Sequence, residues 1–213
     1  MGIFYFPTDF VYWRTIKEHE HVKKQLLAQI EKNTDLFSIT PNITKGVGTV
    51  GNSEGLWIIK NNPKIIQTMV WDSLDILLQE LNSRPNHRPI QVNNSFISNC
   101  WFSKYEGGDI TTVHCHNIDT ASIVRGNKLY KGMFSFIYVI NDENEKNQTE
   151  FIKPTMASTC ASERSDTRFK TSDVEEIREG TIMIFPSSLY HHVNVMCKPN
   201  RMVLSGNIYS TSE

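Results

Sequence analysis

Residues 180–193 read Gly-Thr-Ile-Met-Ile-Phe-Pro-Ser-Ser-Leu-Tyr-His-His-Val. The apolar run from Thr181 to Phe185 is typical of a buried strand, and Pro186 ends it because proline has no backbone N–H to donate to a ladder. A turn follows, and the next extended segment contains His191 and His192. A buried strand, a turn and a second short strand predict antiparallel β-structure here.

The same pattern of short apolar segments and polar turns extends over the chain from Pro89 onward. Gly107-Gly108 and Gly180 mark turns, and a polar stretch runs from Asn141 to Gln148. Turn residues at such regular intervals are typical of an antiparallel double-sheet protein. The predicted strands are 90–94, 96–105, 110–116, 133–140, 150–153, 181–185, 190–196 and 201–209.

The first 90 residues have a different pattern. Segment 3–11 is aromatic and apolar with a proline inside, which is typical of an edge strand. Apolar residues at helical spacing predict helices at 16–32 and 63–82, and Pro63 suits the first turn of the second helix. The Gly- and Asn-rich stretch 44–55 predicts a loop or a short hairpin.

These patterns predict the α+β class, mainly β: a double-stranded β-helix, or jelly roll, with N-terminal helices packed on one sheet. We expect a single domain, 1–213. Within it, residues 1–90 form a helical support region and residues 91–213 form the jelly-roll core.

The composition excludes several classes of protein. The 22 Lys and Arg residues nearly balance the 23 Asp and Glu residues, which argues against a nucleic-acid or membrane-surface binder. The chain lacks a run of apolar residues long enough to span a membrane and lacks a leader-like N-terminus, so a cytoplasmic location is expected. Four cysteines without CxxC pairing favour a reducing compartment over a disulfide framework: Cys100, Cys115, Cys160 and Cys197.

The tripeptide His114-Cys115-His116 is the first candidate for chemistry. Side chains alternate along a strand, so the two imidazoles point one way and the Cys115 thiol points the other. A third histidine on a distant strand would complete one face of a metal's coordination shell, as in mononuclear non-haem iron sites. Three alternatives stay open: the histidines are polar core residues, Cys115 is itself a ligand, or Asp119 replaces His116.

The third histidine comes from the pair His191-His192. The two residues are adjacent, so only one of them can face the metal if the strand is regular.

Arg201 opens the last predicted strand, where it shares a face with Val203, Ser205 and Asn207. Burying a guanidinium without a partner costs free energy, and the carboxylate of an acidic ligand would offset this cost by forming a bidentate salt bridge. Ser205 could donate its hydroxyl to the same carboxylate. A salt bridge between Arg201 and a carboxylate of the protein is the alternative.

Five segments in order resemble the iron(II)- and 2-oxoglutarate-dependent oxygenases, and within them the prolyl-hydroxylase-like branch and related oxygenases of bacteria and their phages. The resemblance covers roughly residues 95–209, and the opening strand and following helix also look like that branch. The matching segments are Trp101-Phe102-x-x-Tyr105-x-Gly107-Gly108, His114-x-His116, Phe134-x-Phe136-Ile137-Tyr138, Gly180-x-Ile182-x-Ile184-Phe185-Pro186-Ser187-x-x-x-His191-x-Val193, and Arg201-x-x-x-Ser205-x-Asn207.

The resemblance implies a metal site of His114, His116 and His191, with His191 preferred to His192. The family's carboxylate ligand is replaced by the imidazole of His116, which removes a negative charge and puts activity in question more than fold.

The resemblance also implies the co-substrate and its contacts. Iron(II), 2-oxoglutarate and dioxygen would hydroxylate a prime substrate, with ascorbate as a supporting reductant. Arg201 would pair with the remote carboxylate of 2-oxoglutarate, and Ser205, Tyr105 and Tyr138 would be further contacts.

Two other functions stay open. A cupin-like dioxygenase with three histidines would not use 2-oxoglutarate, and a jelly-roll binding module would have no catalysis at all. The sequence does not specify the prime substrate, for which a peptidyl or amino-acid side chain is one candidate, or the oligomeric state. We expect segments 117–132 and 155–175 to frame the mouth of the site, with 155–175 as a surface loop.

Overall fold

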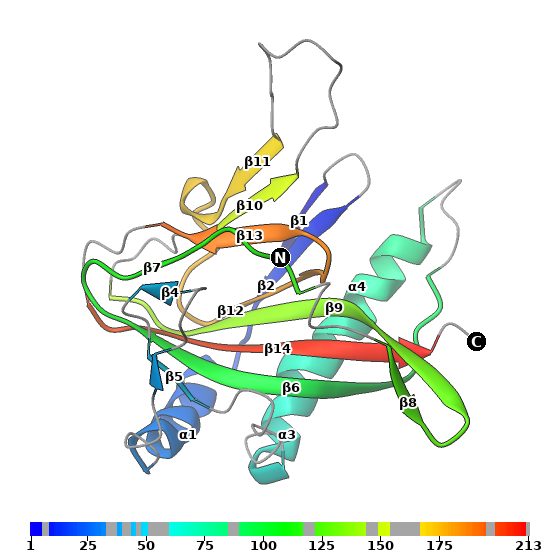
Figure 1. Ribbon diagram of the computed structural model, residues 1–213. Helices are drawn as coiled ribbons and strands as arrows, with labels where there is room; N and C mark the ends of the chain where they lie inside the picture. The colour runs from blue at the N-terminus through cyan, green and yellow to red at the C-terminus, as the bar shows by residue number, and fades with distance from the viewer. Residues whose placement is uncertain are drawn as a thin grey trace.

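Two facing β-sheets, with helices against the outer face of the larger sheet, make up the architecture seen in Figure 1. The computed structural model describes residues 1–5, 9–32, 38–39, 44–45, 48–50, 60–84, 90–116, 122–143, 149–153, 167–194 and 199–211. The mainly β, double-stranded β-helix fold expected from the sequence is confirmed.

The larger sheet is antiparallel and contains nine strands among the described residues, in the order β1-β2-β12-β9-β14-β6-β5-β3, with β8 paired to β9. Four of these strands come from the first 90 residues, so the support region also contributes to the sheet. The bounds are β1 (Gly2–Tyr5), β2 (Phe10–Thr15), β3 (Ser38–Ile39), β5 (Gly48–Val50), β6 (Asn93–Tyr105), β8 (Ile123–Arg125), β9 (Lys128–Asn141), β12 (Thr181–Pro186) and β14 (Arg201–Thr211).

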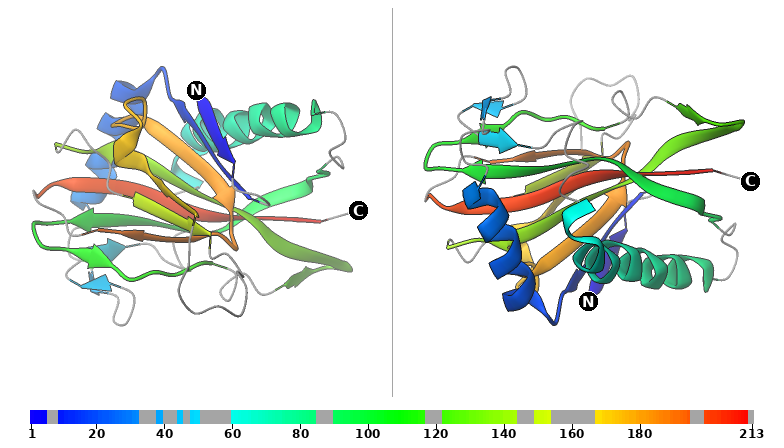
Figure 2. Two further views of the ribbon diagram at one scale, coloured as in Figure 1. Left: turned by 90° about the horizontal axis from the view of Figure 1, so that it is seen from above. Right: turned by 90° about the horizontal axis from the view of Figure 1, so that it is seen from below.

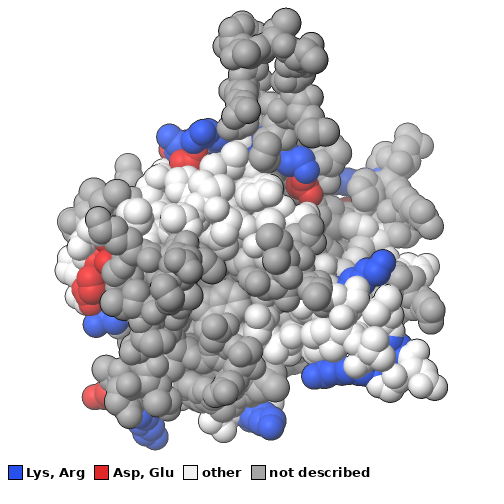
Figure 3. Space-filling view, viewed as in Figure 1, with Lys and Arg blue, Asp and Glu red and all other residues white. Residues whose placement is uncertain are grey.

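The smaller sheet has the order β11-β10-β13, and β4 pairs separately with β7. The bounds are β4 (Thr44–Lys45), β7 (Ile110–Thr111), β10 (Thr149–Lys153), β11 (Thr167–Lys170) and β13 (Tyr190–Val193). In Figure 1 the smaller sheet lies above the larger one, and the β8–β9 hairpin extends past it at the lower right. The exposed basic residues of that hairpin are Arg125, Lys128 and Lys131, and Figure 3 shows basic side chains at the lower right of the molecule.

The helices lie across the outer face of the larger sheet, as Figure 2 shows from below. They are α1 (His19–Lys32) and a continuous second helix made of α3 (Pro63–Ile66), a π-helical turn (Gln67–Trp71) and α4 (Asp72–Asn82). Among the described residues, no helix combines the length and hydropathy needed to cross a membrane.

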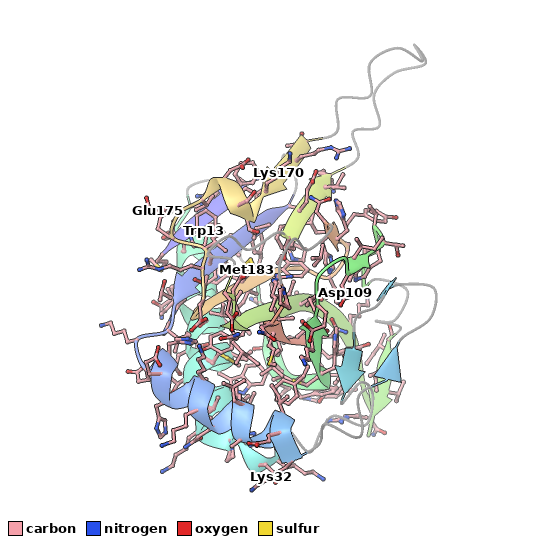
Figure 4. All side chains as sticks on the ribbon, turned by 90° about the vertical axis from the view of Figure 1, so that its left-hand side faces the viewer. Trp13, Lys32, Asp109, Lys170, Glu175 and Met183 are labelled. Carbon is pink, nitrogen blue, oxygen red and sulfur yellow. The ribbon has the colours of Figure 1, made fainter. Side chains whose placement is uncertain are left out.

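Strand alternation divides the buried side chains into two clusters. On β14, Leu204 and Ile208 pack in the cluster under the helices, whereas Val203 packs in the cluster between the sheets. The predicted shared face of alternate β14 residues is therefore confirmed. Met183 belongs to the cluster between the sheets, and Figure 4 shows it in the middle of the molecule.

Several predicted elements were wrong. The segment 3–11 is divided between β1 and β2 rather than forming one edge strand, and a single strand, β6, takes the place of the two predicted at 90–94 and 96–105.

Two further differences have a clear cause. The first helix begins at His19 rather than at residue 16, because residues up to Thr15 pair with β12 and the Ile16 backbone N–H donates to the oxygen of Gly180 (2.9 Å). Residues 155–175 are not all loop, because Thr167–Lys170 form β11 against β10. Phe169 is the cause: it is buried and stacks on Trp13 and Phe4.

Gly206 on β14 leaves no space for a side chain, and we predict that Gly206→Ala destabilises the fold. A Cβ there would lie 2.6 Å from the Phe136 ring and 2.8 Å from the Asn99 backbone oxygen. Overpacking of this kind costs about 1–3 kcal/mol. Chemical denaturation should show that loss for Gly206→Ala and little change for Gly107→Ala, because a Cβ at Gly107 meets no atom within 4 Å. Equal stability of the two variants would contradict the packing argument.

Candidate metal centre

The imidazoles of His114, His116 and His191 converge between the two sheets. Their ligand atoms all lie within 4.8 Å of one another, and the ring centroids are 4.4 Å apart for His114 and His191 and 4.9 Å apart for His116 and His191. A backbone bridge holds the first pair: the His114 N–H donates to the His191 oxygen (3.0 Å), and the His191 N–H donates to the His114 oxygen (2.8 Å). His116 is held separately, because its N–H donates to the oxygen of Ser187 (2.9 Å).

Each imidazole has its Nδ1 against an oxygen that accepts hydrogen bonds. His114 Nδ1 lies 2.7 Å from the backbone oxygen of Thr112, and His191 Nδ1 lies 3.1 Å from that of Leu189. His116 Nδ1 lies 2.7 Å from the side-chain oxygen of Asn207. Carbonyl oxygens only accept, so Nδ1 carries the proton in all three rings and the lone pair of each neutral ring is on Nε2.

Burial favours the neutral, metal-binding form of His191. His191 and His116 are about 4% and 5% exposed. Burial lowers the pKa of His191 well below its usual value, and the neighbouring His114 and His116 lower this pKa further. Three neutral imidazoles converging through Nε2 fit a divalent transition metal such as iron or zinc.

A small polar network surrounds His116. Asn207 Oδ1 accepts from His116 Nδ1 and from the Ser135 hydroxyl (2.7 Å), and Asn207 Nδ2 donates to Asn99 Oδ1 (2.8 Å). Ser135 Oγ also lies 3.0 Å from Ser187 Oγ. Sequence reasoning missed Ser135, although a serine between Phe134 and Phe136 in an apolar strand was a signal of a polar interior.

Arg201 is the first residue of β14 and is buried, with about 1% of its surface exposed. Its Nη2 donates to Thr149 Oγ1 (2.9 Å), and its Nε lies 3.9 Å from Asp142 Oδ2. The guanidinium carbon lies 5.0 Å from the ring centre of Tyr105. Burial lowers the pKa of Arg201, whereas Tyr105 and Asp142 act to raise it. Asp142 thus provides the protein carboxylate that the salt-bridge alternative requires, at a distance too long for a hydrogen bond.

Strand β10 connects Arg201 to the histidines. Thr149, which accepts from Arg201, lies opposite Val193, and Phe151 lies opposite His191. Thr149 and Phe151 point the same way and are about 6.6 Å apart along the strand. The Phe151 ring lies 5.8 Å from the His191 ring. The guanidinium and the three imidazoles therefore line the same interior side of the smaller sheet.

Four other predicted site residues lie as follows. Tyr105 and Ser205 are buried on the interior face, Tyr105 against Arg201 and Ser205 two residues from Asn207 on β14. Tyr138 points to the opposite face, where its hydroxyl is 2.7 Å from His19 Nδ1, so the structure does not bring it to the histidines. The reason is alternation: its neighbours Ile137 and Val139 take the interior positions. Asp119 lies outside the described residues.

His192 and Cys115 are not part of the cluster that the described residues form. His192 has its Nε2 3.6 Å from Glu150 Oε2, on the side of β13 away from His191. Cys115 is partly exposed.

Trp101 is a neighbour of the centre to which the sequence assigned no role. It lies opposite Ser205 on β6, and its ring centre is 5.6 Å from that of His116. Because its ring packs beside His116, Trp101 forms one side wall of the histidine cluster, and it is partly exposed.

Comparison with known proteins finds similarity in structure but not in sequence. No protein-family model matches, and no curated protein matches. Among solved structures, the epimerase SnoN, a non-haem α-ketoglutarate-dependent enzyme of nogalamycin biosynthesis, has a TM-score of 0.61 at 10% identity, with 94% of this chain and 77% of that chain covered.

Two further structures show the same likeness. HygX from Streptomyces hygroscopicus, solved with nickel and 2-oxoglutarate, has a TM-score of 0.55 at 8% identity, over 96% of this chain and 83% of that one. A prolyl hydroxylase from Trichoplax adhaerens, solved with a peptide fragment of hypoxia inducible factor, has a TM-score of 0.53 at 12% identity, over 95% and 83%. This chain therefore shares its fold with these three proteins, two of which are described as an α-ketoglutarate-dependent epimerase and a prolyl hydroxylase.

Proposed function

We propose that this protein is a non-haem iron(II)- and 2-oxoglutarate-dependent dioxygenase that hydroxylates an organic substrate. The observation that carries the proposal is the convergence of His114, His116 and His191, whose ligand nitrogens lie within 4.8 Å of one another, inside a fold of which one solved example holds nickel with 2-oxoglutarate or iron. Iron with 2-oxoglutarate and dioxygen would supply the oxidant for a C–H bond.

The residues of the chain would bind and orient the reactants. His114, His116 and His191 would hold the ion, and co-substrate and dioxygen would bind beside them. Arg201 would hold the remote carboxylate of 2-oxoglutarate, and Thr149 fixes the direction of the guanidinium. Tyr105 and Ser205 would contact the same ligand.

Aromatic rings would keep water away from the metal. Phe151 and Phe185 pack on His191 with ring centres 5.8 and 5.0 Å away. Water-poor surroundings strengthen electrostatic interactions with a bound ion and limit side reactions. Trp101 would form the wall next to His116.

The proposal includes a substrate class. We favour a peptidyl or amino-acid side chain, because one solved relative in fold holds a peptide fragment. A cytoplasmic location and the lack of nucleic-acid and membrane partners remain predictions from composition, and ascorbate remains a candidate supporting reductant.

A three-histidine dioxygenase that does not use 2-oxoglutarate is the second candidate. Two observations favour it: all three clustered ligands are histidines, and Arg201 already has Thr149 and Asp142 beside it. Calorimetric titration of the metal-loaded protein with 2-oxoglutarate under anaerobic conditions separates the two candidates. Binding supports our proposal, whereas lack of binding favours the second candidate. A protein that takes up no stoichiometric metal would be a non-catalytic module.

Arg201→Ala should weaken 2-oxoglutarate binding by about 2–5 kcal/mol, because it removes the cation of a buried charge pair. The measurement is the dissociation constant of 2-oxoglutarate for anaerobic, metal-loaded protein. Arg201→Lys is the control that keeps the charge but not the planar fork, and it should lose part of the affinity. An unchanged dissociation constant in Arg201→Ala would remove this residue from the site.

His191→Ala should abolish metal binding, because it removes one of three converging lone pairs, whereas His192→Ala should retain it. The neighbouring residue is the matched control, since its ring lies toward Glu150 instead. Metal content after dialysis, measured by inductively coupled plasma mass spectrometry, distinguishes the two variants. The reverse result would mean that the register of β13 is wrong by one residue.

Asp119→Asn should leave the metal dissociation constant unchanged, and His116→Ala should raise it strongly, because His116 completes the triad. Titration with zinc against a chromophoric chelator gives both values. A loss of affinity in Asp119→Asn with little change in His116→Ala would make Asp119 the third ligand.

A further inference from the structure

Asn207 has an unusual set of contacts for a residue in the middle of a long strand. It is about 2% exposed, and its amide makes three hydrogen bonds, to His116, Ser135 and Asn99. A buried amide is stable only when its donors and acceptors are satisfied. Here one of those bonds is to a candidate metal ligand.

The directions of the bonds define the amide orientation. Nδ2 donates to Asn99 Oδ1, so Oδ1 faces His116 and accepts from its Nδ1. The Ser135 hydroxyl donates to the same oxygen. The contacts of Asn99 and Ser135 therefore both fit one orientation of the Asn207 amide. With the amide in that orientation, the proton of His116 lies on Nδ1 and its lone pair lies on Nε2.

The backbone is irregular at the same point. Asn207 pairs with Asn99, but the next residue, Ile208, pairs with Ile97, so Ser98 is the extra residue of a β-bulge on β6. Bulges are frequent next to functional sites, where they re-aim side chains. The irregularity therefore lies beside the Asn99–Asn207 pair that holds His116.

We propose that Asn207 is the positioning residue of the metal centre: it sets the tautomer and ring direction of His116 and thereby the metal affinity. This inference rests on the proposed function, because it needs His116 to be a metal ligand. Partners of this kind commonly change metal affinity by about 10- to 100-fold when they are removed. The acceptor is a neutral amide oxygen, so a carboxylate in its place would make the imidazole a stronger donor.

Two substitutions of similar size separate positioning from packing. Asn207→Leu keeps the volume and removes the nearer acceptor of His116 Nδ1, leaving only the Ser135 hydroxyl oxygen at 3.0 Å. Zinc or cobalt affinity should therefore fall about 10- to 100-fold. Asn207→Asp keeps the shape and adds a charge, with the His116 and Ser135 donors still in place. It removes the donor to Asn99 Oδ1, so the Asn99 amide must turn to present its Nδ2 to the new carboxylate. The Asn207→Asp variant should bind the metal more tightly than the wild type.

Asn62→Leu is the matched control. Asn62 is a buried asparagine outside the site, about 5% exposed, and its side chain bonds with that of Gln29 in both directions. Its loss should lower the melting temperature of the metal-free protein and leave metal affinity unchanged.

The experiment titrates zinc and anaerobic cobalt(II) into the wild type and the three variants, with melting temperatures of the metal-free proteins. The cobalt absorption spectrum should shift in Asn207→Leu and Asn207→Asp but not in Asn62→Leu. If both Asn207 variants bind zinc as the wild type does, or if Asn207→Asp binds more weakly, the positioning role is overturned while the metal site stands. A wild type that binds neither ion overturns the proposed function and this inference together. Asn207→Asp keeps the test decisive if Asn207→Leu does not fold.

Discussion

Each imidazole of the candidate centre has its Nδ1 within hydrogen-bond distance of an oxygen acceptor, and His116 Nδ1 also lies 3.0 Å from the hydroxyl oxygen of Ser135. Two acceptors are backbone oxygens two residues earlier in the chain, those of Thr112 and Leu189, so His114 and His191 are oriented by their own segments. His116 is different, because its acceptor is Asn207, which is 91 residues away. The centre therefore depends on the correct docking of β14 against β6 and β9, which places Asn207 behind His116.

The larger sheet serves two functions with its two faces. Apolar side chains on the outer face of the sheet pack under the helices. The inner face, which faces the smaller sheet, has both apolar and polar side chains. On β14 the polar residues of the inner face are Arg201, Ser205 and Asn207, and each is at most about 5% exposed. Burying such groups costs free energy unless each is hydrogen-bonded. Side-chain hydrogen bonds of Arg201 and Asn207 within the protein reduce that cost and at the same time hold the groups in position.

Pattern reasoning worked where a local rule governs the outcome. The buried strand before Pro186, the alternation along β14 and the two helical stripes follow from the side chains of a single segment. It failed where a distant partner decides. Thr167–Lys170 is a strand because Phe169 packs on Trp13 and Phe151. Tyr138 faces α1, where its hydroxyl lies beside His19, because its neighbours Ile137 and Val139 pack between the sheets. The partners of Phe169 and of Tyr138 are far away in the chain, so the sequence around these two residues does not indicate them.

By itself, the order of strands, turns and histidines determined the mainly β class and identified the residues able to bind a metal, since alternation and spacing are properties of one segment. Only the tertiary structure decided which groups meet. It set His191 toward the cluster and His192 toward Glu150, and it placed Thr149 and Asp142 beside Arg201. These outcomes depend on strand register between segments far apart in the chain, and register follows from the packing of both sheets together rather than from any local pattern.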